Sequence, residues 1–384
     1  MSLSRRRFVQ TLGVGAAGAW IGARGREASL FSLEQPLSAA ERMIILSSNE
    51  NPLGPGQAVL DAVKGAYGVA GRYPFSTVGD VTRAVAELHK VKPENVLLGT
   101  GSTQILRTCT HVFTSKERAL ATALPAYEEC SQYAALIGAP VRGVSLDSNF
   151  YMDLGALHKA AVGSGLVFYC NPNNPVATAV DGKSTREFIE RVLRDSPQTT
   201  ILVDEAYFHY ATLPGYETMI PLAVENPRVV VARTFSKAGG MAGLRIGYAI
   251  GHPQTIRKMA EWDATGSVNA LALAAAHASV TQDPSVWAAE ARRNNEARAF
   301  TMKWFSDRGY KPTDSQTNFL FVNVKRPAKE FREACRAQGV LVARDFPPFE
   351  KTHCRISIGT MEEMRKAVEV FGKVLGAPAI TAAA

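Results

Sequence analysis

The strongest constraint on the fold is a series of short apolar runs separated by segments of helix length. The runs lie at residues 95–98, 118–124, 141–146, 166–170, 200–203, 229–232 and 246–250. Strands that are buried on both faces read as continuous apolar runs, and right-handed helical crossovers join parallel strands. The sequence therefore predicts a three-layer α/β/α domain with a mostly parallel sheet. In such sheets ligands lie beyond the carboxyl ends of the strands.

The pattern changes near residue 265, and at 384 residues the chain exceeds the usual size of one hydrophobic core. We expect a second, smaller α/β domain with strands at 318–324 and 355–359 and helices at 328–338 and 361–375. Residues 27–45 read as an irregular arm, and Ser47–Gly56 as a loop rich in Asn, Pro and Gly. The predicted divisions are a signal-like segment 1–26, an N-terminal arm 27–60, a large cofactor-binding domain 61–265 and a small C-terminal domain 266–384.

The first 26 residues form a separate basic segment. They contain five arginines and no acid, and without those arginines the formal net charge falls from +8 to +3. The remaining charges are of mixed sign, which argues against nucleic-acid binding. SRRRFVQ (Ser4 to Gln10), followed by a short weakly apolar stretch, resembles a twin-arginine export signal and predicts a periplasmic protein. A disordered basic tail on a cytoplasmic protein is the alternative.

The sequence also argues against membrane insertion and against a metal site. No apolar run approaches the roughly 20 residues of a spanning helix, so stable membrane insertion is not expected. The five cysteines have neither metal-ligand spacing nor the density of a disulfide scaffold. We interpret them as small buried residues and expect no metal.

A single lysine, Lys237, lies in the run RTFSKAGGMAGLR at residues 233–245. Lysine forms a Schiff base with an aldehyde, and Ser236 and Arg245 could bind a phosphate attached to that aldehyde. Pyridoxal phosphate carries both groups. A lysine among serines and glycines also occurs in ordinary solvated loops, so the surrounding motifs must decide.

Four more motifs fall at strand ends, where a ligand is expected. GTGSTQ at residues 99–104 opens a helix with the hydroxyls of Ser102 and Thr103, which suits a phosphate or a plain connecting turn. Asp204 follows a strand and could keep a pyridinium nitrogen protonated, or simply cap a helix. Asn171 begins the turn NPNNP, and Tyr127 in ALPAY could stack on a planar ring or serve packing alone.

Together these motifs resemble the class I/II pyridoxal-phosphate-dependent aminotransferases of fold type I, and within them the histidinol-phosphate aminotransferase branch. The resemblance covers residues 45–375, and its motifs NENPLGP, RYP, NPNNP, DEAY, RTFSK and AGLRIGY occur in family order. It implies an enzyme that moves an amino group between an amino acid, or histidinol phosphate, and a 2-oxo acid.

The resemblance also assigns residue roles. Lys237 would bind the cofactor as a Schiff base and transfer the α-proton of the substrate, a step worth roughly 10²- to 10⁴-fold. Asp204 would pair with the pyridine nitrogen, Asn171 and Tyr207 with the ring oxygen, and Tyr127 would stack on the ring. The phosphate would be held by Ser102, Thr103, Ser236 and Arg245. Tyr73 would reach the phosphate of a partner subunit, which implies a homodimer. Asn51 in the arm and Arg355 in CRISIGT would bind substrate, the arginine through a bidentate pair with a carboxylate.

The sequence departs from the branch at three positions, and other activities stay open. Many histidinol-phosphate enzymes carry an acidic pair where this chain has Thr103 and Gln104, and an aromatic residue at the position of Leu53. A decarboxylase or lyase on the same scaffold, like the threonine-phosphate decarboxylases, is the rival activity. A protein that binds cofactor or amine without turnover is the third possibility, which the retention of Lys237 opposes.

Overall fold

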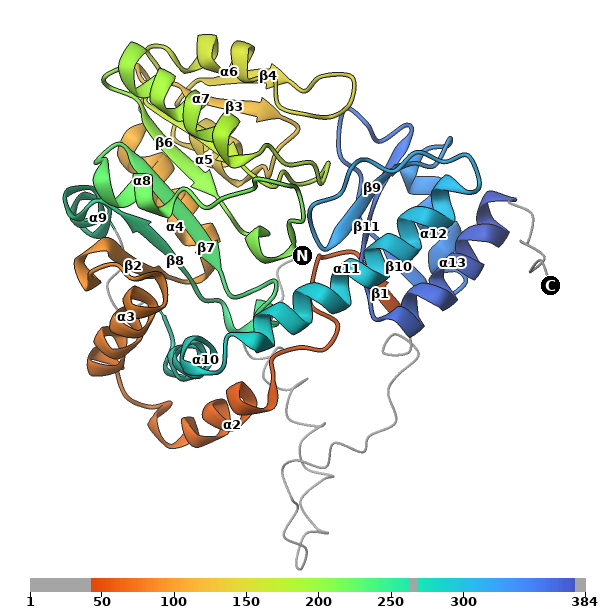
Figure 1. The fold of residues 1–384 in the computed structure, drawn as a ribbon, viewed down its shortest axis with the longest axis horizontal. Helices are drawn as coiled ribbons and strands as arrows, with labels where there is room; N and C mark the ends of the chain where they lie inside the picture. Colours follow the sequence, from red (N-terminus) through yellow and green to blue (C-terminus); the bar gives the residue numbers. More distant parts are fainter. Residues whose placement is uncertain (1–42, 263–267, 377–384) are drawn as a thin grey trace, which may run out of the picture. The chain divides into compact units, whose positions relative to one another are not determined.

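The computed structural model describes residues 43–262 and 268–376 (Figure 1). The twin-arginine-like segment and residues 27–42 of the arm lie outside the described residues, so their predicted roles stay predictions. No helix in the described ranges is both long and apolar enough to cross a membrane.

The strands and helices follow the predicted alternation. The strands are β1 (Ile44–Leu46), β2 (Val96–Gly99), β3 (Leu120–Leu124), β4 (Val141–Ser145), β5 (Leu166–Cys170), β6 (Thr200–Asp204), β7 (Val229–Thr234), β8 (Gly247–Gly251), β9 (Phe319–Asn323), β10 (Val340–Val342) and β11 (His353–Ser357). The helices are α2 (Gln57–Gly65), α3 (Phe75–His89), α4 (Gly101–Phe113), α5 (Glu129–Leu136), α6 (Leu154–Ala161), α7 (Gly182–Asp195), α8 (Ile220–Glu225), α9 (Pro253–Ala260), α10 (Ala270–Thr281), α11 (Ser285–Ser306), α12 (Ala328–Arg336) and α13 (Met361–Leu375).

The main sheet has seven strands in the order β2-β8-β7-β6-β5-β3-β4. Neighbouring strands from β7 through β4 pair in parallel. Strand β8 runs antiparallel to both of its neighbours, so β2 points the same way as the parallel set. The predicted mostly parallel sheet of fold type I is confirmed. The chain segments that follow β2, β3, β5, β6 and β7 consequently leave the sheet at one edge.

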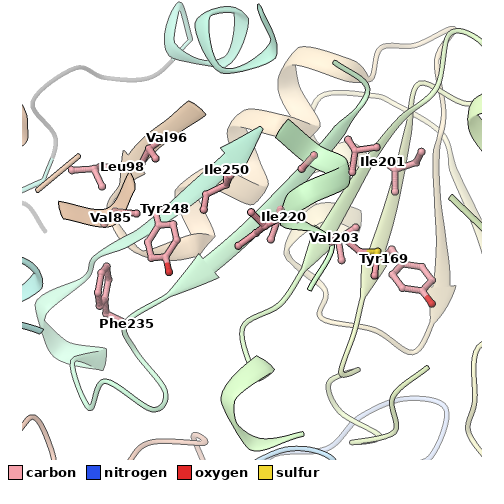
Figure 2. Packing of buried hydrophobic residues seen from close by; sticks show 14 of the residues in the cluster. Val85, Val96, Leu98, Tyr169, Ile201, Val203, Ile220, Phe235, Tyr248 and Ile250 are labelled. Atoms are coloured by element: carbon pink, nitrogen blue, oxygen red, sulfur yellow. The ribbon is translucent and has the colours of Figure 1, made fainter. Parts of the chain in front are cut away.

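Both faces of the sheet are buried along its central strands, which explains why these strands read as apolar runs, whereas the edge strand β4 is mostly exposed. Along β5 the side chains alternate, with Val167 and Tyr169 in one core and Leu166 and Phe168 in the other. Figure 2 shows part of the first core, to which Tyr169 of β5, Val203 of β6 and Ile250 of β8 belong. Helices α3, α6, α7, α8 and α10 contribute to this core, and α4, α5 and α9 to the opposite one. The result is the predicted three-layer arrangement.

The C-terminal part of the chain has a core of its own, built around the antiparallel pair β9 and β11. Strand β1 pairs in parallel with β10, and the Leu46 side chain packs into this core. The expectation of an irregular arm over residues 27–45 was therefore wrong at its last two residues. Three-residue strands are too short to show a periodicity, and tertiary pairing formed β1 and β10 despite that.

The predicted domain boundaries remain predictions. The 26/27 boundary lies outside the described residues, the 60/61 boundary falls inside helix α2, and the 265/266 boundary lies in the undescribed stretch 263–267.

A buried ion pair joins the ends of β6 and β7. The Nε and Nη2 atoms of Arg233 donate to Oε2 of Glu205 at 2.9 and 2.6 Å, and both side chains are at most 5% exposed. The Thr218 hydroxyl and the Met219 amide also donate to this carboxylate, at 2.8 and 2.7 Å. The guanidinium carbon lies 3.8 Å from the centroid of the Phe208 ring. Each charge is thus compensated where water cannot reach it.

We predict that Arg233→Met lowers the free energy of unfolding by about 3–5 kcal/mol, because it leaves the Glu205 carboxylate buried without its counter-charge. Arg83→Met, which breaks the exposed pair with Asp80, should cost less than about 1 kcal/mol. Urea unfolding measures both. The double variant Glu205→Gln, Arg233→Met removes both charges and should recover part of the loss. Equal effects of the two single variants would contradict this account.

Candidate active site

A cavity of about 830 Å³ opens at the edge where the parallel strands end. Its walls come from three parts of the chain: the arm at Ser47–Glu50, the segments after β2, β3, β5, β6 and β7, and the C-terminal segment around β10 and β11. Of the predicted site residues, it brings together Lys237, Ser102, Thr103, Tyr127, Asp204, Tyr207, Ser236, Arg245 and Arg355.

One end of the cavity is suited to an anion. Helix α4 begins at Gly101, and Ser102 and Thr103 are the next two residues of its first turn. Backbone amides and hydroxyl groups therefore meet at the positive end of the helix. A Cβ atom on Gly101 would lie 2.6 Å from Nη2 of Arg245, and Gly101 has a φ of +73°. Glycine is therefore required for the guanidinium to approach the first turn of the helix.

Arg245 and Ser236 complete this end of the cavity. Arg245 has a left-handed backbone with a φ of 59°, a conformation that costs a non-glycine residue about 1–3 kcal/mol. Its Nη1 donates to the Ala242 carbonyl at 2.9 Å, which fixes the side chain. The Ser236 hydroxyl accepts from Thr234 Oγ1 at 3.0 Å. Held in this way, the set has the donors and the charge that a phosphate needs.

Lys237 also lines the cavity. Its Nζ donates to the Ser48 carbonyl at 3.3 Å and lies 5.6 Å from the centroid of the Tyr207 ring. Burial lowers the pKa of Lys237 to about 8, and the positive charge of Arg355 acts in the same direction. Far more of this amine is neutral at pH 7 to 8 than for an ordinary lysine, and only the neutral form acts as nucleophile or base.

Asp204 ends strand β6, Tyr207 follows three residues later, and both line the cavity. Burial raises the pKa of the Asp204 carboxyl to about 7, although a hydrogen bond from the Ala206 amide at 3.2 Å opposes the shift. The Tyr207 hydroxyl accepts from Asn49 Nδ2 at 3.1 Å. The ionised form of a carboxyl group that is shielded from water is stabilised most when a positively charged ligand enters the cavity.

Tyr127 and Arg355 line other parts of the cavity wall. Burial raises the pKa of Tyr127, and its hydrogen bond with Thr103 opposes the shift. Arg355 on β11 is 8% exposed; its Nη1 donates to Asn174 Oδ1 at 2.7 Å and its Nη2 to the Ser47 carbonyl at 2.8 Å. Its buried Nε has no hydrogen-bond partner among the described residues.

Asn171 does not line the cavity, contrary to its predicted contact with the cofactor ring. Its amide group is bound to Val180, donating to the carbonyl and accepting from the backbone amide, both at 2.9 Å. The asparagine that this turn presents to the cavity is Asn174. Three asparagines stand in the run NPNNP, and the sequence offers no signal that separates the one holding the turn from the one facing a ligand.

Asn51 and Tyr73 also lie outside this cavity. Asn51 holds the arm to the lysine loop, since its Nδ2 donates to the Ala238 carbonyl at 3.3 Å. The arm residues that line the cavity are the four preceding it, Ser47–Glu50. Tyr73 is 83% exposed and stacks on Phe75 with ring centroids 5.6 Å apart.

Asn49 is a central residue that sequence reasoning missed. It is 1% exposed, and its side chain donates from Nδ2 to the Tyr207 hydroxyl and accepts on Oδ1 from Ser357 Oγ at 2.8 Å. Its backbone carbonyl accepts from Asn318 Nδ2 at 3.0 Å. It thus ties the arm to both the Asp204 strand end and β11. Its position in the NENP motif was the available signal.

Fold and site together define an enzyme of the pyridoxal-phosphate-dependent fold type I class. The chain belongs to the aminotransferase class I and II family, which it matches over residues 41–371. It is 32% identical over 335 residues to the histidinol-phosphate aminotransferase of Symbiobacterium thermophilum, covering 87% of this chain and 91% of that one.

Solved structures agree with this assignment. A crystal structure of histidinol-phosphate aminotransferase from Sinorhizobium meliloti in complex with pyridoxal 5'-phosphate superposes with a TM-score of 0.80 at 25% identity, covering 91% of this chain and 98% of that one. L-threonine-O-3-phosphate decarboxylase from Porphyromonas gingivalis shares the fold, with a TM-score of 0.75 at 20% identity over 87% of this chain and all of that one. The predicted aminotransferase activity is confirmed at the level of the family.

We predict that Asp204→Asn stabilises the protein without added cofactor, by about 2–4 kcal/mol at pH 8. The folded-state pKa of about 7 exceeds the ordinary value of 3.8, so the folded state binds more protons between these pH values. The free energy of unfolding of the wild type should therefore fall as the pH rises through this range, and an amide cannot ionise. Urea unfolding at pH 4.5 and 8 tests this.

The exposed Asp61 supplies the control, since Asp61→Asn should change the unfolding free energy little at either pH. A loss of stability in Asp204→Asn at pH 8 would contradict the assigned pKa.

Proposed function

We propose that this aminotransferase holds pyridoxal phosphate in the 830 Å³ cavity and moves an amino group from an amino acid to a 2-oxo acid. One observation carries the proposal. The Lys237 amine with its lowered pKa, the buried Asp204 carboxyl group and the anion-binding end of the cavity at the start of α4 all face the same space. When bound, the cofactor supplies a sink for the electron pair left behind when the α-proton of the substrate departs.

The donor set suits this cofactor. Ser102, Thr103, Ser236 and Arg245 would hold the phosphate at the start of α4. Asp204 would keep a proton on the ring nitrogen, because a positive ring compensates its buried charge. Tyr127 would cover the ring face. At the ring oxygen we propose Tyr207 together with Asn174, since the amide of Asn171 is bound to Val180.

Lys237 would carry the proton in the reaction. With a pKa of about 8, its Nζ can accept a proton and return it at neutral pH. The Ser48 carbonyl, 3.3 Å away, orients the amine. Arg355 would bind the α-carboxylate of the substrate, and its unpaired buried Nε gains a partner when an anion arrives.

A second candidate donor is histidinol phosphate, which several curated relatives are named for. This chain departs from many of those enzymes at Leu53, Thr103 and Gln104. Leu53 is 62% exposed and does not line the main cavity, so its effect on the substrate would be indirect. Decarboxylation would use the same residues with a different bond held perpendicular to the ring.

We predict that the protein loaded with pyridoxal phosphate absorbs in the visible region, and that Lys237→Ala loses this band because the covalent link to Nζ is gone. Amino acids and histidinol phosphate, added one at a time to the wild type, should reveal the donor by bleaching the band. Recovery of the band on addition of a 2-oxo acid demonstrates transamination. Release of carbon dioxide would support the decarboxylase instead, and a wild type without any band would refute the proposal.

We also propose that the protein is a homodimer in which Tyr73 reaches the phosphate of the partner subunit. Tyr73 is exposed and does not line the cavity of its own chain. A role at a phosphate would therefore place it in the cavity of a partner subunit. Exposed Phe75, Tyr67, Val69 and Leu60 lie near it in sequence and would gain from burial in an interface.

A mixing experiment tests this arrangement. Lys237→Ala and Tyr73→Ala are each expected to lose most activity, whereas a refolded equal mixture should recover about a quarter of the wild-type value. In a mixed dimer the Tyr73→Ala subunit keeps its own lysine and borrows the intact tyrosine of its partner. Light scattering should give twice the mass of one chain. A mixture no better than its components would reject the shared site.

Export through the twin-arginine route stays a prediction from Ser4–Gln10, and a cytoplasmic location is the alternative.

A further inference from the structure

We infer that the amino donor carries a single carboxylate and an uncharged, largely apolar side chain, and that Glu128 is the residue that sets this preference. The inference rests on the proposed function, because it names the substrate class of the same site. The wall that the C-terminal part of the chain contributes to the cavity carries arginines whose charges are paired in different ways.

Three arginines line that wall: Arg332, Arg344 and Arg355. Arg332 is 2.5 Å from the Asp345 carboxylate, and Arg344 forms an ion pair with Glu128. Arg355 instead binds neutral groups, the Asn174 side chain and the Ser47 carbonyl. Protein carboxylates thus compensate two of the three guanidinium groups, and Arg355 alone among them keeps its positive charge for a ligand.

The contact between Glu128 and Arg344 spans the cavity wall. Glu128 lies at the start of helix α5, after β3, and Arg344 follows β10, 216 residues further along the chain. Arg344 is also held by Nη1, which donates to the Asp345 carbonyl at 3.0 Å, and by the ring of Phe346, whose centroid lies 4.5 Å away. Glu128 therefore occupies the Arg344 guanidinium, which a second anionic group of a substrate would otherwise bind.

The space between the two arginines is apolar. Phe346 is 4% exposed and has the Arg344 and Arg355 guanidinium carbons 4.5 and 4.6 Å from its ring centroid. Leu341 and Val342 line the cavity beside it. A donor whose carboxylate binds Arg355 would place its side chain among these groups, where an uncharged chain gains from burial.

An acidic side chain gains little here. To bind Arg344, the acidic side chain of a ligand must displace the Glu128 carboxylate. The displaced carboxylate then remains beside the ligand as a like charge. Because the pair is at the cavity mouth, with Glu128 33% and Arg344 59% exposed, the exchange is opposed by charge rather than by packing. Removing the charge of Glu128 should therefore admit acidic ligands.

The experiment compares two inert ligands on the cofactor-loaded protein by titration calorimetry: glutarate, which is glutamate without its amino group, and 4-methylpentanoate, which is leucine without its amino group. Wild-type protein should bind 4-methylpentanoate at least as tightly as glutarate. Glu128→Gln should bind glutarate about tenfold more tightly and change 4-methylpentanoate less than twofold. Glu128→Gln combined with Arg344→Gln should lose the gain.

Glu129→Gln is the matched control, since Glu129 is the next carboxylate in the chain, pairs with Arg107 and does not line the cavity. It should leave both affinities unchanged. An unchanged affinity ratio in Glu128→Gln, or a wild type that prefers glutarate, would overturn the inference. Either result in a protein that still transaminates leaves the proposed function standing, whereas absence of cofactor binding or transamination refutes that function itself.

Discussion

The buried pair between Glu205 and Arg233 is the constraint on which the site depends. Each member stands next to a strand end that carries chemistry: Glu205 follows Asp204, and Arg233 lies four residues before Lys237. Four hydrogen bonds to Glu205 in a dry environment hold the β6 and β7 ends in one register. The carboxyl group and the amine therefore face one cavity, and neither needs a direct contact with the other to be positioned.

Much of the fold follows from hydrophobic pattern alone. The central strands of the main sheet could be located because both of its faces are buried there, which makes them apolar runs, whereas the edge strand β4 is mostly exposed. The site residues at strand ends followed for the same reason, since parallel strands deliver Ser102, Tyr127 and Asp204 to one edge. The order and direction of the strands thus bring residues that are far apart in the sequence close together in space.

What the sequence could not supply was contact between distant short segments. Strands β1 and β10 are three residues long, so no period distinguishes them from loop. Choosing Asn174 over Asn171 as the residue that faces the cavity required knowing which side chain holds the turn, a question of hydrogen-bond geometry. The pairing of Glu128 with Arg344 joins two ordinary surface residues across 216 positions, and neither lies in a motif.

The pairing of Ile44–Leu46 with Val340–Val342 also governs the order in which the enzyme can be assembled. On the ribosome the arm emerges first, yet its partner strand is made last among the elements that surround the cavity, apart from β11. The sheet and the lysine loop can fold earlier, with the cavity still open on the side that Ser47–Glu50 will cover. Closure of the cavity therefore has to await completion of the C-terminal core.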